Sequence, residues 1–179
     1  MKSKKEIAFH TFYLLVIGIS FIILKLFYKI ADNSDLLFLL KPISFIIDVF
    51  TNSDSFFSLE SGYYYPDLQI TIDKSCSGFQ FWLLTSTFFG FQFFWKRTSN
   101  SFLILPMLIL ATYFLTIIAN ISRILITIQT RIMLKSFSIP FTSNLHEGLG
   151  AFIFLFFFIS ANLSLLYFMR QMNATPSKS

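Results

Sequence analysis

Long apolar stretches separated by polar segments dominate the chain. Four of these stretches reach the roughly 20 helical residues that cross a bilayer core of about 30 Å. They are residues 7–30, 76–95, 101–123 and 145–169. Pro106 lies in the third stretch, where a membrane helix tolerates it. The pattern predicts an all-α polytopic membrane protein with about four transmembrane helices.

The segment 31–75, between the first two stretches, has a pattern of its own. An apolar stretch within it is too short to span, and it places five residues on one helical face, which indicates a short interfacial or re-entrant helix. These are Leu36, Leu40, Ile43, Ile47 and Phe50. Residues 68–72 alternate between apolar and polar, as in a half-buried strand, and Phe56 to Glu60 could pair with them. We therefore expect a small extracytoplasmic β-hairpin, with Tyr63 to Tyr65 in an interfacial aromatic belt or, less favoured, lining a substrate groove.

The charged residues predict the orientation of the helices. One side of the four-span arrangement carries seven basic residues, which makes it cytoplasmic by the positive-inside rule. These are Lys2, Lys4, Lys5, Lys96, Arg97, Arg170 and Lys178. Eight of the nine acidic residues fall on the other side. Both termini are therefore expected in the cytoplasm, with outer loops at 31–75 and 124–144 and a disordered tail at 173–179.

Composition excludes several classes of protein. Hydrophobic residues make up 55% of the 179 positions and charged residues 13%, half the share of about 25% in soluble proteins. A disordered chain, a disulfide-rich mini-protein and an ordinary cytosolic enzyme are excluded. The net charge of +5 does not indicate nucleic-acid binding, because the basic residues are divided between the two faces. Residues 1–179 are read as one membrane-embedded domain, with no motif for a metal or cofactor.

Three residues with reactive side chains fall at one depth of the predicted membrane. Cys76 begins the second span, Arg123 ends the third and His146 begins the fourth, all on the outer side. His10, the other histidine, lies near the cytoplasmic start of the first span, a membrane thickness away. Arg131 is expected in the outer loop or along the interface, away from this group. Each residue has an ordinary structural interpretation, and the coincidence of depth favours a shared site.

The local sequence supports this interpretation. Ser77 to Gln80 fits a capping box, so Cys76 lies at a helix N-terminus, where N–H groups stabilise a thiolate. Asn144 to Glu147 also fits a capping pattern, with Asn144 as the cap. A thiolate, a proton-carrying histidine and an arginine that holds an oxyanion can together perform acyl transfer through a thioester. Water would resolve the thioester in a protease, and an amine in a transpeptidase.

The motifs that carry these residues resemble the exosortase/archaeosortase family. They are Ser75-Cys76-Ser77-Gly78, Asn120-Ile121-Ser122-Arg123 and His146-x-x-x-Gly150, within residues 74–154. The resemblance implies a cysteine nucleophile at Cys76, a transition-state stabiliser at Arg123 and an acid/base at His146. It also implies partners: exported proteins that end in a short motif, a transmembrane helix and a basic tail. Such proteins would be cleaved and transferred to a surface anchor at the outer face of the bacterial cytoplasmic membrane.

The chain has fewer spans than the larger members, and in this it is similar to the compact type called exosortase K. Two alternatives stay open. A non-catalytic membrane scaffold or assembly factor for envelope or polysaccharide export would leave the thiol inert. A small transporter would need polar residues deep in the spans, where Gln92, Thr112, Thr116 and Asn162 are the notable ones and inter-helix hydrogen bonds explain them. The substrate, the acceptor, the oligomeric state and the choice between base and acid at His146 are left open by the sequence.

Overall fold

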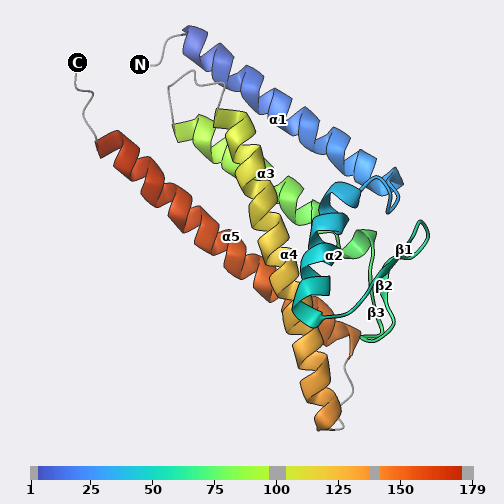
Figure 1. Cartoon of the computed structure of the whole chain (residues 1–179). Coiled ribbons are helices and arrows are strands. Elements are labelled where there is room, and N and C mark those ends of the chain that lie inside the picture. The colour runs from blue at the N-terminus through green and yellow to red at the C-terminus, as the bar shows by residue number, and fades with distance from the viewer. Residues whose placement is uncertain (1–3, 97–103, 138–141, 175–179) are drawn as a thin grey trace.

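A computed structural model of the protein describes residues 4–96, 104–137 and 142–174. These residues form long helices and a small three-stranded sheet. In chain order they are α1 (Lys4–Ile30), α2 (Leu37–Thr51), β1 (Phe56–Ser58), β2 (Gly62–Tyr65), β3 (Ile70–Ile72), the 3₁₀ turn η1 (Lys74–Cys76), α3 (Phe79–Lys96), α4 (Ile104–Ser136) and α5 (Ser143–Ala174). Helix α3 packs between α1 and α4, and α4 also contacts α2 and α5. The start of α1 and the end of α5 lie at one end of the molecule, and the sheet lies at the other (Figure 1).

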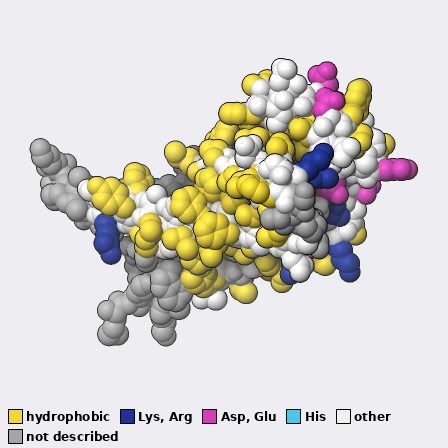
Figure 2. All heavy atoms as spheres, turned by 90° about the horizontal axis from the view of Figure 1, so that it is seen from below, with side chains coloured by type: hydrophobic (Ala, Val, Ile, Leu, Met, Phe, Trp, Pro, Cys, Tyr) yellow, Lys and Arg dark blue, Asp and Glu magenta, His cyan; other side chains and the backbone are white. Residues whose placement is uncertain are grey.

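Three helical segments in the described part of the chain are long and apolar enough to cross a membrane. They are Thr11–Ile30, Leu105–Ser136 and Asn144–Gln171. Hydrophobic side chains spread over the surface of the helices, and acidic side chains gather toward the end that carries the sheet (Figure 2). This distribution indicates a membrane protein. The second predicted span forms α3, which is not among these three segments, so its crossing stays a prediction.

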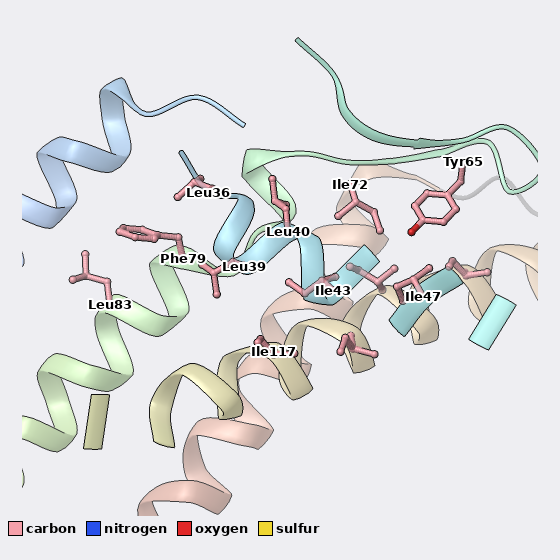
Figure 3. Close-up of a cluster of buried hydrophobic side chains, with 13 residues drawn as sticks. Leu36, Leu39, Leu40, Ile43, Ile47, Tyr65, Ile72, Phe79, Leu83 and Ile117 are labelled. Carbon is pink, nitrogen blue, oxygen red and sulfur yellow. The ribbon is translucent and has the colours of Figure 1, made fainter. Parts of the chain in front are cut away.

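Helix α2 forms where the short apolar helix was expected. Its predicted face is buried at Leu36, Leu40, Ile43 and Ile47, whereas Phe50 is 71% exposed. The buried face packs in one hydrophobic cluster with β2, β3, α3 and α4 (Figure 3). The apolar face that predicted an interfacial helix therefore contacts protein.

A proline inside α2 is accommodated by a side chain from α4. Pro42 has no N–H to donate to the carbonyl of Phe38, four residues earlier. The hydroxyl of Tyr113 donates to that carbonyl instead, at 2.6 Å. The contact compensates the lost helical hydrogen bond and fixes α2 against the middle of α4.

The sheet differs from the predicted hairpin. The two expected strands form as β1 and β3, but they pair with β2, which lies between them in an antiparallel sheet. The tyrosine run that was assigned to an aromatic belt is this central strand. Tyr65 is buried, and its hydroxyl donates to Asp48 at 2.6 Å. Burial, and then this hydrogen bond, raise the pKa of Tyr65 above its ordinary value.

The predicted outer loop 124–144 is wrong over most of its length, because α4 continues to Ser136. Its apolar positions keep a helical spacing beyond Arg123, and the residues of this stripe are buried. They are Ile117, Ile121, Ile124 and Ile128. Arg131 lies on this continued helix and donates to the carbonyl of Gln69, in the turn before β3, at 3.0 Å. The helix is extended because it is the base on which α2 and the sheet pack.

Candidate active site

Cys76 ends the 3₁₀ turn η1, and two residues, Ser77 and Gly78, separate it from α3. Asp73 caps this turn by accepting hydrogen bonds from the amide and the hydroxyl of Ser75. Gly78 has φ +74°, which permits the sharp change of direction from η1 into α3. The hydroxyl of Ser77 accepts from the first amide of α3 at 3.3 Å, so Ser77 caps the helix. Cys76 is half-buried at this junction, and its Sγ lies 3.8 Å from the hydroxyl of Ser75.

Polar contacts with α1 and the segment after it hold the turn on its other side. The amide of Lys74 donates to Asn33, and the hydroxyl of Tyr28 donates to the carbonyl of Lys74. The ammonium of Lys74 donates to the carbonyl of Ala31 at 2.6 Å, beyond the last turn of α1, where a cation is favourable. These hydrogen bonds fix the residue before Ser75.

Asn120 connects the Cys76 turn to α4. Its side-chain amide donates to the backbone carbonyl of Cys76. A Cβ at Gly78 would come within 3.0 Å of Thr116 and 3.4 Å of Asn120, so the close packing of this turn on α4 requires glycine. Asn120 is fully buried, and its carbonyl oxygen has no hydrogen-bond partner among the described residues. The sequence motif contains Asn120, but no role could be given to it, because no pattern shows that it meets the Cys76 turn.

Arg123 lies one turn further along α4 and contacts His146 from α5. The terminal nitrogen Nη2 of Arg123 is 3.3 Å from Nε2 of His146. The guanidinium also lies 5.3 Å from the ring centre of Phe154. Gly150 provides the space for the arginine, since a Cβ there would lie 2.6 Å from Nε. The arginine is therefore enclosed by one face of α5, at the start of that helix.

The contact between Arg123 and His146 determines the form of the imidazole. A guanidinium has donors only, so Nε2 must be the acceptor in this hydrogen bond. The ring nitrogen that faces Arg123 then carries no proton, and the histidine is neutral in this arrangement. The guanidinium occupies this nitrogen, so the contact does not by itself choose between the base and acid roles that the sequence left open.

A pocket of about 300 Å³ joins the two parts of the site. Arg123 and Glu147 line it, and so do Ser75 and Gly78, which lie one residue before and two residues after Cys76. Cys76, Ser77 and His146 are not among the lining residues. The structure thus brings Arg123 and His146 into contact and sets the Cys76 turn against the same pocket.

Two other expectations have clear outcomes. The predicted cap Asn144 is wrong by two residues, because the Thr142 hydroxyl accepts from the amide of Leu145 and α5 begins at Ser143. Threonine and asparagine are both common helix caps, so the pattern alone did not identify the right one. His10 lies in α1, 18 residues before Tyr28, or about 27 Å along the helix, and is therefore far from the site. Among the described residues, no group of three or more His, Cys, Asp or Glu could hold a metal ion.

Comparisons with protein-family models, with curated proteins and with solved structures give no match to this chain.

Proposed function

We propose that this chain is a membrane-embedded cysteine peptidase or transpeptidase. Cys76 would be the nucleophile, His146 the proton carrier and Arg123 the group that binds the oxyanion. One observation carries the proposal: Arg123, which contacts His146 at 3.3 Å, lines the same pocket as Ser75, the residue before Cys76. The three groups come from η1, α4 and α5, which are far apart in the sequence.

The proposed reaction has two halves, the formation of a thioester at Cys76 and its breakdown. His146 takes the proton of the Cys76 thiol, and Sγ attacks the carbonyl carbon of the scissile peptide, forming a C–S bond. Arg123 donates to the oxyanion of the tetrahedral intermediate. The C–N bond then breaks, and the leaving amine takes the proton from His146. Water converts the resulting thioester to a carboxylic acid and the thiol, whereas an amine converts it to a new amide.

The hydrogen bond between Arg123 and His146 fits this order of reaction steps. While the pocket is empty, the guanidinium donates to Nε2 of the imidazole. A substrate carbonyl that enters the pocket offers the guanidinium a second acceptor. When Arg123 turns to that oxygen, Nε2 is released and can accept the thiol proton. Substrate entry would therefore prepare the oxyanion site and the base together.

The proposal includes a four-span topology with both termini in the cytoplasm of a bacterium. Helix α3 packs along α1 and α4, and its 18 residues extend about 27 Å, close to the thickness of a bilayer core. The start of α1 and the end of α5 lie at one end of the molecule, opposite the sheet (Figure 1). The site would then face the outside, where it could meet exported proteins that end in a motif, a transmembrane helix and a basic tail.

Processing of such a protein in cells tests the proposal. The substrate is an exported protein from the same genome with that C-terminal signal, and its cleavage is followed by gel mobility. Cys76→Ala, Cys76→Ser and His146→Ala should each abolish cleavage while the protein stays in the membrane at a normal level. Serine fails because its hydroxyl is far less acidic than a thiol. Leu145→Ala, at an exposed neighbour of His146, is the matched control and should cleave normally.

The single cysteine of the chain gives an independent test of orientation. A membrane-impermeant maleimide should modify Cys76 in intact spheroplasts. Labelling only after the cytoplasmic face is opened would invert the topology. Full cleavage by Cys76→Ala would remove the catalytic proposal and leave the scaffold alternative.

A further inference from the structure

A groove between α1 and α3 is open to the side of the molecule and belongs to no part of the proposed chemistry. Its volume is about 670 Å³. Apolar side chains of both helices form most of its walls. They are Phe21, Ile22 and Leu26 from α1, and Phe79, Leu83 and Leu84 from α3. A groove of this kind in a membrane protein would face hydrocarbon chains.

Three lysines line the same groove. Lys25 and Lys29 are one helical turn apart on α1, and Lys74 approaches from η1. The ammonium of Lys74 is held by the carbonyl of Ala31, and it lies 5.0 Å from the ring centre of Tyr28. Lys25 and Lys29 are exposed, and within the described residues neither forms an ion pair with a carboxylate. The groove therefore combines apolar walls with a local excess of positive charge.

The polar and apolar residues of the groove are ordered along the two helices. Along α1, the two lysines lie toward the sheet end, and Phe21 and Ile22 lie further into the span. Helix α3 begins at the sheet end, so Gln80 lies on the same level as the lysines and Leu84 lies deeper. The polar and basic groups are thus confined to one end of the groove, and the other end is wholly apolar. This is the arrangement that an amphiphile with an anionic head and apolar tails requires.

We propose that this groove binds one anionic phospholipid, with its phosphate at Lys25 and Lys29 and its acyl chains along α1 and α3. The lipid neutralises charges that have no partner in the described protein, and its chains cover the apolar walls. Tyr28, Phe79 and Gln80 line both this groove and the pocket beside Cys76, so the bound headgroup lies next to the candidate active site. The binding site rests on the groove alone and does not depend on the proposed reaction.

Native mass spectrometry of the full chain in detergent tests the proposal. The delipidated protein is titrated with dioleoyl phosphatidylglycerol, with dioleoyl phosphatidylcholine and with glycerol 3-phosphate. We expect one phosphatidylglycerol to bind clearly more tightly than phosphatidylcholine. The double variant Lys25→Gln/Lys29→Gln should lose about tenfold in affinity for phosphatidylglycerol, since each lysine near an anionic headgroup contributes roughly a severalfold factor.

Matched variants separate this site from general attraction. Lys41→Gln/Lys135→Gln removes two exposed lysines outside the groove and should change the affinity less than twofold. Lys25→Arg/Lys29→Arg keeps the charge and should keep the binding, which controls for folding. Leu84→Trp should fill the groove and weaken binding of the lipid.

Three results would overturn the proposal. Equal binding of the two phospholipids would show an apolar surface without headgroup recognition. Equal losses from the two glutamine pairs would show non-specific electrostatic attraction. Displacement of the lipid by glycerol 3-phosphate alone, with no effect of Leu84→Trp, would show a free phosphate site in place of a lipid site.

Discussion

Gly150 offers the most direct test of the arginine geometry. A Cβ at this position would lie 2.6 Å from Nε of Arg123 and 3.3 Å from its Cζ. Carbon and nitrogen atoms in ordinary contact need about 3.5 Å or more. Gly150→Ala must therefore displace the guanidinium by roughly 1 Å, away from α5 and from its contact with His146.

The displacement should affect the reaction much more than the fold. Alanine gains about 1 kcal/mol of helix propensity over glycine inside a helix, and this gain offsets part of the strain at the flexible end of the arginine. We expect the melting temperature in detergent to change little. A catalytic group that is misplaced by about 1 Å costs about a hundredfold in rate, so cleavage of the substrate should fall by that order.

Gly148 provides the matched control, because the same substitution there meets open space. A Cβ at Gly148 has no atom within 4 Å. Gly148→Ala should therefore leave the cleavage rate unchanged and raise the melting temperature slightly. Both variants are assayed at equal amounts of membrane-inserted protein. Full activity in Gly150→Ala, or an equal loss in both variants, would refute the placement of Arg123 at the reacting carbonyl.

Further predictions concern three polar contacts. Arg123→Ala should lower the cleavage rate by about a hundredfold. Arg123→Lys should restore little of this rate, because an ammonium lacks the planar fork of a guanidinium. Arg131→Ala should lose only the hydrogen bond to the turn before β3, and the cleavage rate should change only a few-fold. Asn120→Leu should lower the unfolding free energy by about 1–3 kcal/mol, because a partly buried carbonyl of the Cys76 turn loses its donor. Asn120→Asp should not restore this free energy. The folded-state pKa of Tyr65 is raised, so its contribution to stability is complete below the unfolded value of about 10 and is lost as the pH rises further. Chemical denaturation at alkaline pH should show this loss of unfolding free energy. Tyr65→Phe should abolish the pH dependence, although it also removes the hydrogen bond to α2. A pH dependence that persists in Tyr65→Phe would belong to another group.

The sequence correctly predicted elements in which the spacing of apolar residues matches the pattern of burial. Helix α2 is an example, because Leu36, Leu40, Ile43 and Ile47 repeat at helical spacing and all are buried. The junction at Cys76 is a second success of local sequence, since the capping box from Ser77 to Gln80 predicted the start of α3. In these segments the local pattern and the tertiary environment favour the same structure.

Other parts depend on contacts that no local pattern contains. The Tyr63 to Tyr65 run has no alternation of polar and apolar residues, yet it becomes the central strand, because Tyr65 finds an acceptor in Asp48. The third span was expected to end at Arg123, because a helix that continued to residue 134 would be longer than a bilayer core is thick. The helix continues because α2 and the sheet provide a protein surface for its apolar stripe. Asn120 could be assigned a position but not a role, because its partner lies 44 residues away in the sequence.

The contacts of α4 have a consequence for the order in which the protein assembles. This helix supplies Asn120 to the Cys76 turn, Arg123 to α5 and Tyr113 to α2. During synthesis the cysteine is made first, and its turn cannot be completed until α4 has entered the membrane beside it. The imidazole follows only with α5. If the site works as proposed, a nascent or truncated chain that ends before α4 carries the thiol without the oxyanion donor, and one that ends before α5 still lacks the base, so reactivity begins only when the last helix is inserted.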